Sequence, residues 1–316
     1  MAYLKIPKGW EIPEREAAPE HVYLNRRLNR RKFLAALGLS SIAAGGILPR
    51  SVLGADSPYP AKRNPEYPLD RPMTPESIST RYNNFIEFSH EKDQVWQLVD
   101  YFKTEPWTIQ VSGLVHKKQT LDLFKLIRQM PLEERLYRHR CVEAWSMAVP
   151  WTGFPLKALL DRVQPASDAK FIRMVSFYRP DQAPGQQLQK KYPWPYYDGL
   201  TMEEAMNDLT FLVTGMYGHE LPKQNGAPIR LAVPWKYVFK SIKSIAAIEF
   251  LETMPKKHLT FWHDVLPDHY DFSANVDPDV PHPRWSQKME TELGTWRKRP
   301  TLKYNGYGKY VAHLYE

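Results

Sequence analysis

The amino-acid sequence predicts an α+β fold of mixed sheets with short helices, arranged as a single large domain. Three observations lead to this prediction. Short runs of apolar, β-branched residues recur between Pro- and Gly-containing segments, which is typical of strands. Helical periodicity is limited to short segments. The 316 residues are 43% hydrophobic and 13% aromatic, enough to bury a full core and too aromatic for a disordered chain.

The first part of this domain is predicted to begin irregularly and then to alternate between short helices and a strand. Residues 56–80 carry six prolines among serines and charges, so we expect an extended arm with little helix or strand. Residues 93–102 fit a short helix, and residues 107–111 alternate like a strand that ends in a turn at Ser112-Gly113. Thr120 is predicted to cap another helix, which Pro131 ends.

The centre of the chain holds the remaining predicted elements. Residues 135–142 alternate weakly and are predicted to form a strand that ends at Cys141. The elements after it are a helix over 156–163, a strand over 170–178, a helix that starts at a capping box over 201–204, and strands over 209–214, 229–233 and 244–251. Residues 253–316, rich in Pro, His, Asp and aromatics, are predicted to be irregular.

The first 55 residues have the layout of an export signal. A basic block that contains Arg30-Arg31 and is followed by Phe33-Leu34 fits a twin-arginine signal, and a mild apolar stretch comes next. The small residues before Ala55 predict cleavage there. An uncleaved membrane anchor is the alternative, but about sixteen apolar residues diluted by glycine are short for a span of roughly 20. We therefore expect transport to the periplasm by the twin-arginine export machinery.

The charge and the cysteine content restrict the class of protein. The chain has a net charge of +8, of which residues 1–55 carry +5, so the part expected to remain carries only +3. A nucleic-acid-binding protein needs a clustered basic face, and none is predicted here. Cys141 is the only cysteine, which excludes an intrachain disulfide and a site built from several cysteines.

Cys141 is the first candidate for chemistry. A buried structural thiol is the ordinary interpretation, because free cysteine is among the most buried residue types. In an exported protein a spare thiol risks oxidation, which favours a functional role. Arg138 and Arg140 could stabilise a thiolate. Cys141 could then ligate a soft metal, or it could be a nucleophile with His139 as its base, because alternate residues of a strand share a face.

Two further groups of residues could bind a ligand. Arg230 begins an otherwise apolar strand after an Asn-Gly turn, so it needs an anion, either a structural carboxylate or a phosphate. Three lysines follow it (Lys236, Lys240 and Lys243), which favours phosphate. Four histidines (His258, His263, His269 and His282) are irregularly spaced in a Pro-rich stretch, so we expect solvated loop residues rather than metal ligands.

Several segments together are specific enough to indicate a family. They are Tyr82–Phe88, Pro131–Arg135, Arg140–Met147 with Pro150–Leu156, Pro184–Gln187, Gln224–Arg230, Val233–Tyr237 and His282–Gln287. In this order they resemble the molybdenum catalytic subunits of periplasmic protein-methionine-sulfoxide reductases, in the sulfite oxidase superfamily. The resemblance runs from about residue 66 to the end of the chain.

The resemblance implies a sulfite-oxidase-type molybdopterin-binding fold over residues 81–316, with one Mo-molybdopterin. Cys141 matches the cysteine that ligates molybdenum. The residues matching pterin contacts are Asn83, Ile86, Glu87, Ser176, Asn225, Arg230, Ser241, Ile242 and Lys243. Arg230 and Lys243 would hold the phosphate. Ile86 and Ser176 depart from the family pattern, which often has an aromatic residue and Thr at these positions.

The implied activity is the reduction of methionine sulfoxide in oxidised periplasmic proteins. The implied partner is a membrane haem b subunit that supplies electrons from the quinone pool. Aromatics such as Trp145, Trp151 and Tyr178 could line an open site, although core packing is their commoner fate. The alternatives are a sulfite oxidase-like enzyme, a small S- or N-oxide reductase on the same cofactor, a Cys/His hydrolase, and a non-catalytic exported binding protein.

Overall fold

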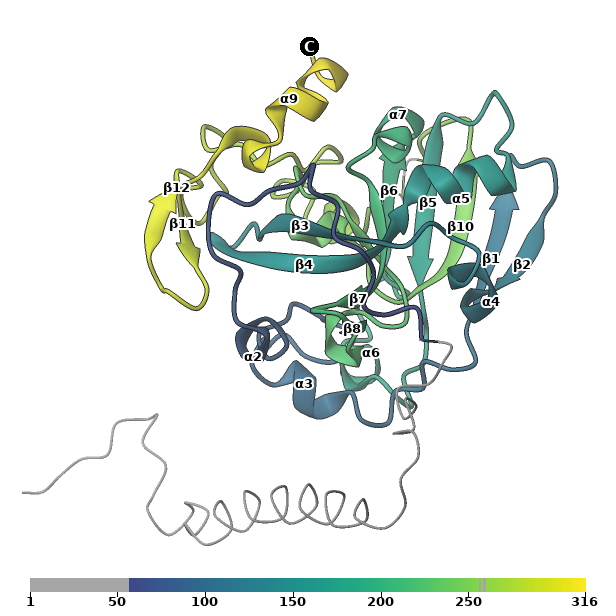
Figure 1. Cartoon of the computed structure of the whole chain (residues 1–316), viewed down its shortest axis with the longest axis horizontal. Helices are drawn as coiled ribbons and strands as arrows, with labels where there is room; N and C mark the ends of the chain where they lie inside the picture. Colours follow the sequence, from purple (N-terminus) through teal and green to yellow (C-terminus); the bar gives the residue numbers. More distant parts are fainter. Residues whose placement is uncertain (1–56, 256, 258–259) are drawn as a thin grey trace, which may run out of the picture. The chain divides into compact units, whose positions relative to one another are not determined.

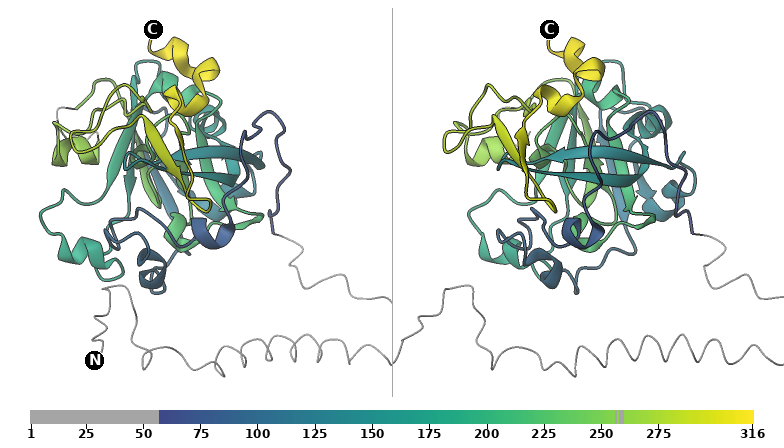
Figure 2. Two further views of the ribbon diagram at one scale, coloured as in Figure 1. Left: turned by 90° about the vertical axis from the view of Figure 1, so that its left-hand side faces the viewer. Right: turned by 60° about the vertical axis from the view of Figure 1, so that its left-hand side comes forward.

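The structure is a computed structural model that describes residues 57–316, apart from 256, 258 and 259. The predicted signal over residues 1–55, its cleavage point and His258 lie outside the described residues. Asp56–Glu316 form one compact unit, built on two mixed sheets whose strands cross at a steep angle (Figures 1 and 2). The predicted mixed-sheet fold with short helices in a single domain is confirmed.

The first sheet has the strand order β2-β1-β10-β5-β6. Its strands are β2 (Gln119–Asp122), β1 (Thr108–Gly113), β10 (Ile245–Leu251), β5 (Phe171–Ser176) and β6 (Tyr197–Thr201). The pair β1–β10 is parallel and the other pairs are antiparallel. The predicted turn at Ser112-Gly113 is wrong, because Gly113 ends β1 at φ +81° and pairs with Phe250, whose carbonyl leaves no room for a Cβ.

The second sheet is organised by one long strand. Its strands are β12 (Lys298–Pro300), β11 (Met289–Glu292), β4 (Trp145–Pro155), β7 (Phe211–Met216) and β8 (His219–Glu220), with β3 (Glu133–Arg140) paired to β4 and β9 (Arg230–Ala232) paired to β7. β4 is antiparallel to β3 along one edge, while β11 and β7 share its other edge. The turn between β3 and β4 carries Cys141.

The helices are short and lie around the sheets (Figure 1). They are α2 (Glu76–Ser79), α3 (Val95–Leu98), α4 (Leu123–Ile127), α5 (Leu156–Val163), α6 (Pro184–Leu188), α7 (Met202–Met206), α8 (Phe261–Val265) and α9 (Gly308–Val311). The predicted capping box of α7 is present, with Thr201 and Glu204 exchanging hydrogen bonds. The predicted cap at Thr120 is wrong, since Thr120 lies in β2 and Asp122 caps α4 by accepting from the backbone N–H of Lys125.

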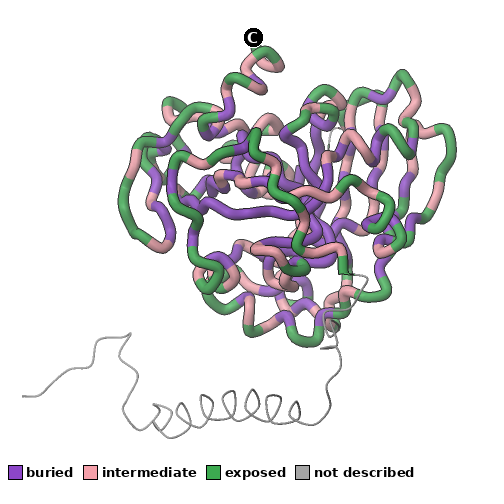
Figure 3. Tube along the Cα trace, in the orientation of Figure 1, coloured by how far each residue is buried: buried purple, intermediate pink, exposed green. Residues whose placement is uncertain are grey.

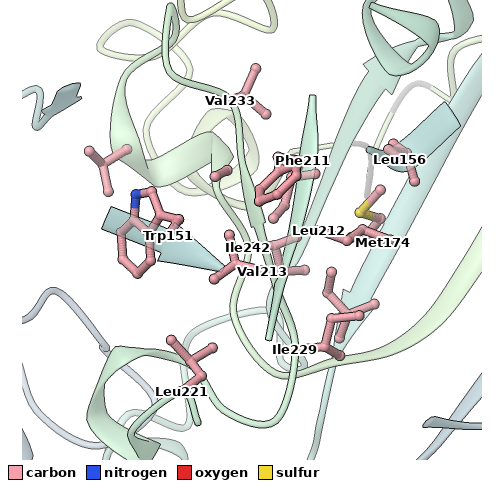
Figure 4. Packing of buried hydrophobic residues seen from close by; sticks show 14 of the residues in the cluster. Trp151, Leu156, Met174, Phe211, Leu212, Val213, Leu221, Ile229, Val233 and Ile242 are labelled. Carbon is pink, nitrogen blue, oxygen red and sulfur yellow. The ribbon is translucent and has the colours of Figure 1, made fainter. Parts of the chain in front are cut away.

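The core fills the space between the two sheets (Figure 3). In the view of Figure 4, Phe211 on β7 lies between Trp151 on β4 and Met174 on β5, with Ile242 and Leu156 in the same cluster. Each of these side chains is buried, and apolar burial of this kind contributes roughly 1.5–3 kcal/mol per large side chain. Within the described residues, no helix is both long and apolar enough to cross a bilayer.

Six strands were not predicted from the sequence: β2, β4, β6, β8, β11 and β12. β4 is buried at nearly every position and contains Pro150, so it shows neither the alternation of a half-buried strand nor an uninterrupted apolar run. β11 and β12 lie in the stretch predicted to be irregular. β11 is held by pairing with β4, where Thr291 of β11 pairs with Trp145, more than a hundred residues earlier in the chain. β12 in turn pairs with β11.

Candidate functional site

The main cavity opens beside the turn that follows β3. It is formed by four chain segments: residues 84–92, the turn at 141–143, residues 238–243 with Tyr196, and residues 262–270. It holds about 760 Å³ of empty space, its open mouth included. β3 and β4 place Cys141 here, because their antiparallel pairing ends at Arg140 and Ser146 and the chain must reverse between them.

Cys141 is buried and lines this cavity. Its Sγ accepts a hydrogen bond from Asn84 Nδ2 at 3.1 Å and one from the backbone N–H of Glu143 at 3.5 Å. Burial, together with the nearby Glu143 carboxylate, raises the pKa of the thiol to about 12. The free thiol is therefore protonated at neutral pH and is a poor nucleophile, whereas a bound soft metal would displace the proton.

Glu143 is the ionised group nearest to this sulfur, with Oε2 3.6 Å from Sγ. Lys92 pairs with it at 3.0 Å. Burial alone would raise the pKa of Glu143, but Lys92, Asn84 and Trp145 outweigh burial and hold it below its usual value. Cys141 thus lies beside a carboxylate that stays ionised and is paired with Lys92, and both charged side chains line the main cavity.

A smaller inner cavity adjoins the main one and shares Asn84, Val238 and Lys243 with it. It is also lined by Asn83, Asn225, Arg230, His139 and the rings of Trp145 and Trp151. Its polar residues come from the end of β3, the start of β9, and the segments before α3, β9 and β10. The two cavities together form a pocket that reaches from Cys141 to Arg230.

The inner cavity carries buried positive charge with no carboxylate partner. Arg230 donates to the carbonyls of Asn225 and Ser241 at 2.8 and 3.2 Å, and no acidic side chain of the described residues pairs with it. Burial lowers its pKa to about 9, so it remains charged at neutral pH. Burial and the Arg230 charge lower the pKa of Lys243, and burial with both cations lowers that of His139. An anion is the missing partner.

Two amide oxygens in the same cavity also lack partners. Asn83 and Asn225 both donate through Nδ2 to the carbonyl of Ser79, at 3.1 and 2.9 Å, which fixes the orientation of both amides. Their Oδ1 atoms are buried and have no hydrogen-bond partner among the described residues. A ligand here should present N–H donors and an anionic end, as a pterin with its phosphate does. The residues present therefore fit molybdopterin.

Comparison with known proteins agrees with this fit. Residues 96–259, just over half of the chain, match the oxidoreductase molybdopterin binding domain. The chain belongs to this family. It is also similar to the crystal structure of the sulfane dehydrogenase SoxCD from Paracoccus pantotrophus, with a TM-score of 0.43 and 15% sequence identity. That match covers 68% of this chain and 57% of the other, so the chain spans little more than half of that protein's length.

The structure of this molybdopterin-binding oxidoreductase brings nearly all of the predicted site residues together. Those lining the main cavity are Ile86, Glu87, Cys141, Ser241, Ile242 and Lys243. Those lining the inner cavity are Asn83, Asn225, Arg230 and, again, Lys243. Ser176 lines neither, but its hydroxyl donates to the carbonyl of Lys243 at 2.8 Å. Ser176 therefore supports the position of Lys243.

The lysine-rich phosphate site predicted around Arg230 is wrong for two of its three lysines. Lys236 pairs with Glu204 at 2.5 Å, and Lys240 pairs with Asp198 at 2.7 Å, all four residues being buried. Both are structural ion pairs. Lys243 alone of the three lines the two cavities; in the described residues it forms no close ion pair, and Glu87 is the carboxylate that interacts with it.

The aromatic lining also differs from the prediction. Trp145 and Trp151 line the inner cavity, while Tyr178 is exposed and lines neither cavity. The main cavity is instead lined by four aromatics that sequence reasoning did not single out: Tyr196, Phe239, Trp262 and Tyr270. No local pattern could have found Trp262 and Tyr270, since they reach the site only through the loop around α8. Asn84 and Glu143, also missed as site residues, lie within the segments that carry the family resemblance.

The Cys/His hydrolase alternative has no geometric support. His139 lies in β3 and lines the inner cavity, whereas Cys141 lies in the turn beyond it and lines the main cavity. No hydrogen bond between the two is found in the described part of the chain. A protonated thiol without a base is not activated for acyl transfer.

Proposed function

We propose that this chain is a molybdenum-dependent catalytic subunit that reduces methionine sulfoxide residues in oxidised periplasmic proteins. One observation carries the proposal. The cavity that contains the Cys141 thiol is open, has aromatic walls, and has the Glu143 carboxylate as the charge nearest to the sulfur. Aromatic rings favour contact with methionine sulfur, and a fixed negative charge disfavours an anionic substrate. A neutral sulfoxide on a side chain meets both conditions.

The residues that would hold the cofactor follow from the two cavities. Cys141 would ligate molybdenum, and Arg230 with Lys243 would bind the phosphate. The orphaned oxygens of Asn83 and Asn225 would accept from the pterin. Ile86, Glu87, Ser241 and Ile242 would enclose it, with Ser176 behind Lys243. When bound, the molybdenum cofactor supplies two-electron oxygen-atom transfer.

The chain's own side chains would position the substrate. Phe239, Trp262 and Tyr270 present an apolar, polarisable wall to the methionine side chain. Trp262 and Tyr270 lie 5.5 Å apart between ring centroids, and residues of this size at an open mouth limit water at the reacting sulfur. The overall reaction consumes two electrons and two protons, breaks the S–O bond, and yields thioether and water.

The cellular setting is part of the same proposal. Electrons would come from a membrane haem b subunit linked to the quinone pool, and the protein would act in the periplasm after twin-arginine export. The basic, glycine-diluted leader over residues 1–55 and the resemblance to periplasmic reductases support this setting.

A substrate comparison tests the proposal. Protein loaded with cofactor is supplied with electrons from a reduced dye and offered, in separate assays, a methionine sulfoxide peptide, dimethyl sulfoxide and trimethylamine N-oxide. Sulfite is tested with the dye oxidised. We expect the highest kcat/KM with the peptide. Turnover of sulfite alone, or faster turnover of the small oxides than of the peptide, would refute it.

A further inference from the structure

A third cavity, here called the acidic cavity, adjoins the main cavity. The two share Val142, Phe239 and Tyr270. The acidic cavity holds about 1050 Å³ of empty space, its mouth included, and so exceeds the main cavity on the same measure. A ligand seated at Cys141 could therefore extend past Phe239 and Tyr270 into the acidic cavity without a change in the fold.

The acidic cavity has an excess of negative charge. Asp268, Asp271 and Asp277 line it, against the single cation Lys303. Lys303 lies 3.6 Å from Asp277, and its side chain is 59% exposed, so this pair neutralises little. Asp271 accepts hydrogen bonds within its own loop, from Ser273 and from the backbone of Ala274. In the described part of the chain, neither Asp268 nor Asp271 forms an ion pair within 4.0 Å, although Lys236, paired with Glu204, also interacts with Asp271.

A second, independent feature of this cavity is the unpaired nitrogen of His282. The side chain is buried, at 7% exposure, and stacks on Trp285 at 3.8 Å between ring centroids. Its Nδ1 faces the backbone N–H of Arg284 at 3.2 Å and must accept, which places the proton on Nε2. Nε2 is buried and finds no acceptor among the described residues. The expectation of a solvated histidine is therefore wrong at this position.

These features define the chemistry of the missing ligand. The Nε2–H donor calls for a carbonyl or similar acceptor, since a buried donor without one is destabilising. The carboxylates that line the cavity favour a ligand with a positive charge. A metal ion does not fit, because the described residues contain no group of three His, Cys, Asp or Glu side chains placed to hold one. A polypeptide that carries a basic side chain offers both an acceptor and a cation.

We infer that the acidic cavity is a subsite for the polypeptide segment next to the methionine sulfoxide, and that it selects a lysine or arginine there. His282 donates to a backbone carbonyl of that segment, and Asp268 and Asp271 attract its basic side chain. This inference rests on the proposed function, since it supplies the segment that flanks the reacting residue.

Matched peptides test the subsite. Each carries one methionine sulfoxide, flanked on both sides by lysine in one peptide, by glutamine in the second and by glutamate in the third. We expect KM to be roughly tenfold lower for the lysine than for the glutamate peptide, with kcat little changed, and the ratio to shrink at 0.5 M salt. Equal KM values for all three peptides would overturn the subsite. Turnover of the same peptides would still uphold the proposed function.

Two variants and a control locate the effect. Asp268→Asn, at an exposed side chain with no ion pair among the described residues, should weaken the lysine preference about two- to fivefold. His282→Phe keeps an aromatic ring on Trp285 and should raise KM for all three peptides alike. Asp168 is another exposed aspartate and lines none of the three cavities. The control Asp168→Asn should therefore leave the KM values of all three peptides unchanged. An unchanged preference in Asp268→Asn would overturn the inference.

Direct titration separates this inference from the proposed function. The lysine and glutamate peptides with unoxidised methionine are titrated calorimetrically into cofactor-loaded protein without an electron donor. Tighter binding of the lysine peptide that is lost in Asp268→Asn upholds the subsite even if no sulfoxide is turned over. Equal binding of the two peptides overturns it whatever the assays of turnover show.

Discussion

Arg230 offers the sharpest test of the phosphate site, through the substitution Arg230→Met in cofactor-free protein. Burial lowers the pKa of Arg230 from 12.5 to about 9, which at about 1.36 kcal/mol per unit is a charge-burial cost of at most roughly 5 kcal/mol. Methionine removes that cost but leaves the carbonyls of Asn225, Ser241 and Leu231 without a donor, at roughly 1–3 kcal/mol each. At about 1.5–2 kcal/mol each, the three lost hydrogen bonds nearly cancel the charge-burial cost, so the unfolding free energy should change by less than about 2 kcal/mol.

The loaded protein should behave differently. There Arg230 would make charge-assisted hydrogen bonds to the anionic end of the cofactor, worth roughly 1.5–3 kcal/mol each. One such bond corresponds to a ten- to hundredfold loss of affinity, at about 1.4 kcal/mol per factor of ten. Molybdenum and pterin content after gel filtration, together with denaturant unfolding of both forms, measures the two quantities separately.

Arg135→Met is the matched control. Arg135 is also buried, but it has a carboxylate partner, Glu133, and lies at the far end of β3, away from both cavities. Removing it should lower the unfolding free energy by roughly 2–4 kcal/mol and leave cofactor content unchanged. The reasoning fails if Arg230→Met retains full molybdenum and pterin, or if it destabilises the cofactor-free protein as much as Arg135→Met does.

Three further predictions address the same site. Cys141→Ser should abolish turnover and lower molybdenum content, yet change the unfolding free energy by only about 1 kcal/mol, because the three hydrogen bonds of Sγ are weak; circular dichroism with metal analysis checks this. Burial raises the pKa of Glu87 from 4.5 to about 7, so cofactor-free protein should lose stability as pH rises through that interval, and Glu87→Gln should remove this slope in urea titrations at pH 4.5–7. Gly226→Ala should lower stability by about 1–3 kcal/mol and release cofactor, since φ is +103° and a Cβ would lie 2.7 Å from Lys243 Cγ; a thermal melt with metal analysis, showing no loss of either, would contradict it.

Elements with a local cause were predictable from the sequence. The helix over 156–163 agrees with α5 at both ends because its apolar stripe and the flanking Pro155 are local signals. The capping box at Thr201 is equally local. β4 was not predictable in this way, because the side chains on both of its faces are buried. A strand buried on all sides loses the alternation that local pattern reading depends on.

The residues of the site also divide into those with a local signal in the sequence and those that depend on distant partners. Cys141 and Arg230 were found because each is an anomaly within its own segment, a lone thiol and a charge in an apolar strand. The lysines after Arg230 were misassigned because their partners, Glu204 and Asp198, are distant in the chain. Sequence proximity alone could not separate a lysine that neutralises a buried carboxylate from one that faces a cavity. Only Lys243 remains after the structural pairs are removed.

The charges around the pocket also explain how an elongated cofactor would be oriented. At one end, Arg230 and Lys243 supply positive charge, and among the described residues only Glu87, near Lys243, offers a carboxylate there. At the other end, Glu143 lies beside Cys141 and keeps its negative charge through Lys92. A cofactor that is anionic at its phosphate and carries a metal at its opposite end has lower energy in one direction than in the reverse. Reversal would place phosphate against Glu143 and leave Arg230 buried without an anion. The same polarity places the Glu143 carboxylate beside Cys141, so under the proposed function it would link cofactor orientation to a preference for a neutral substrate.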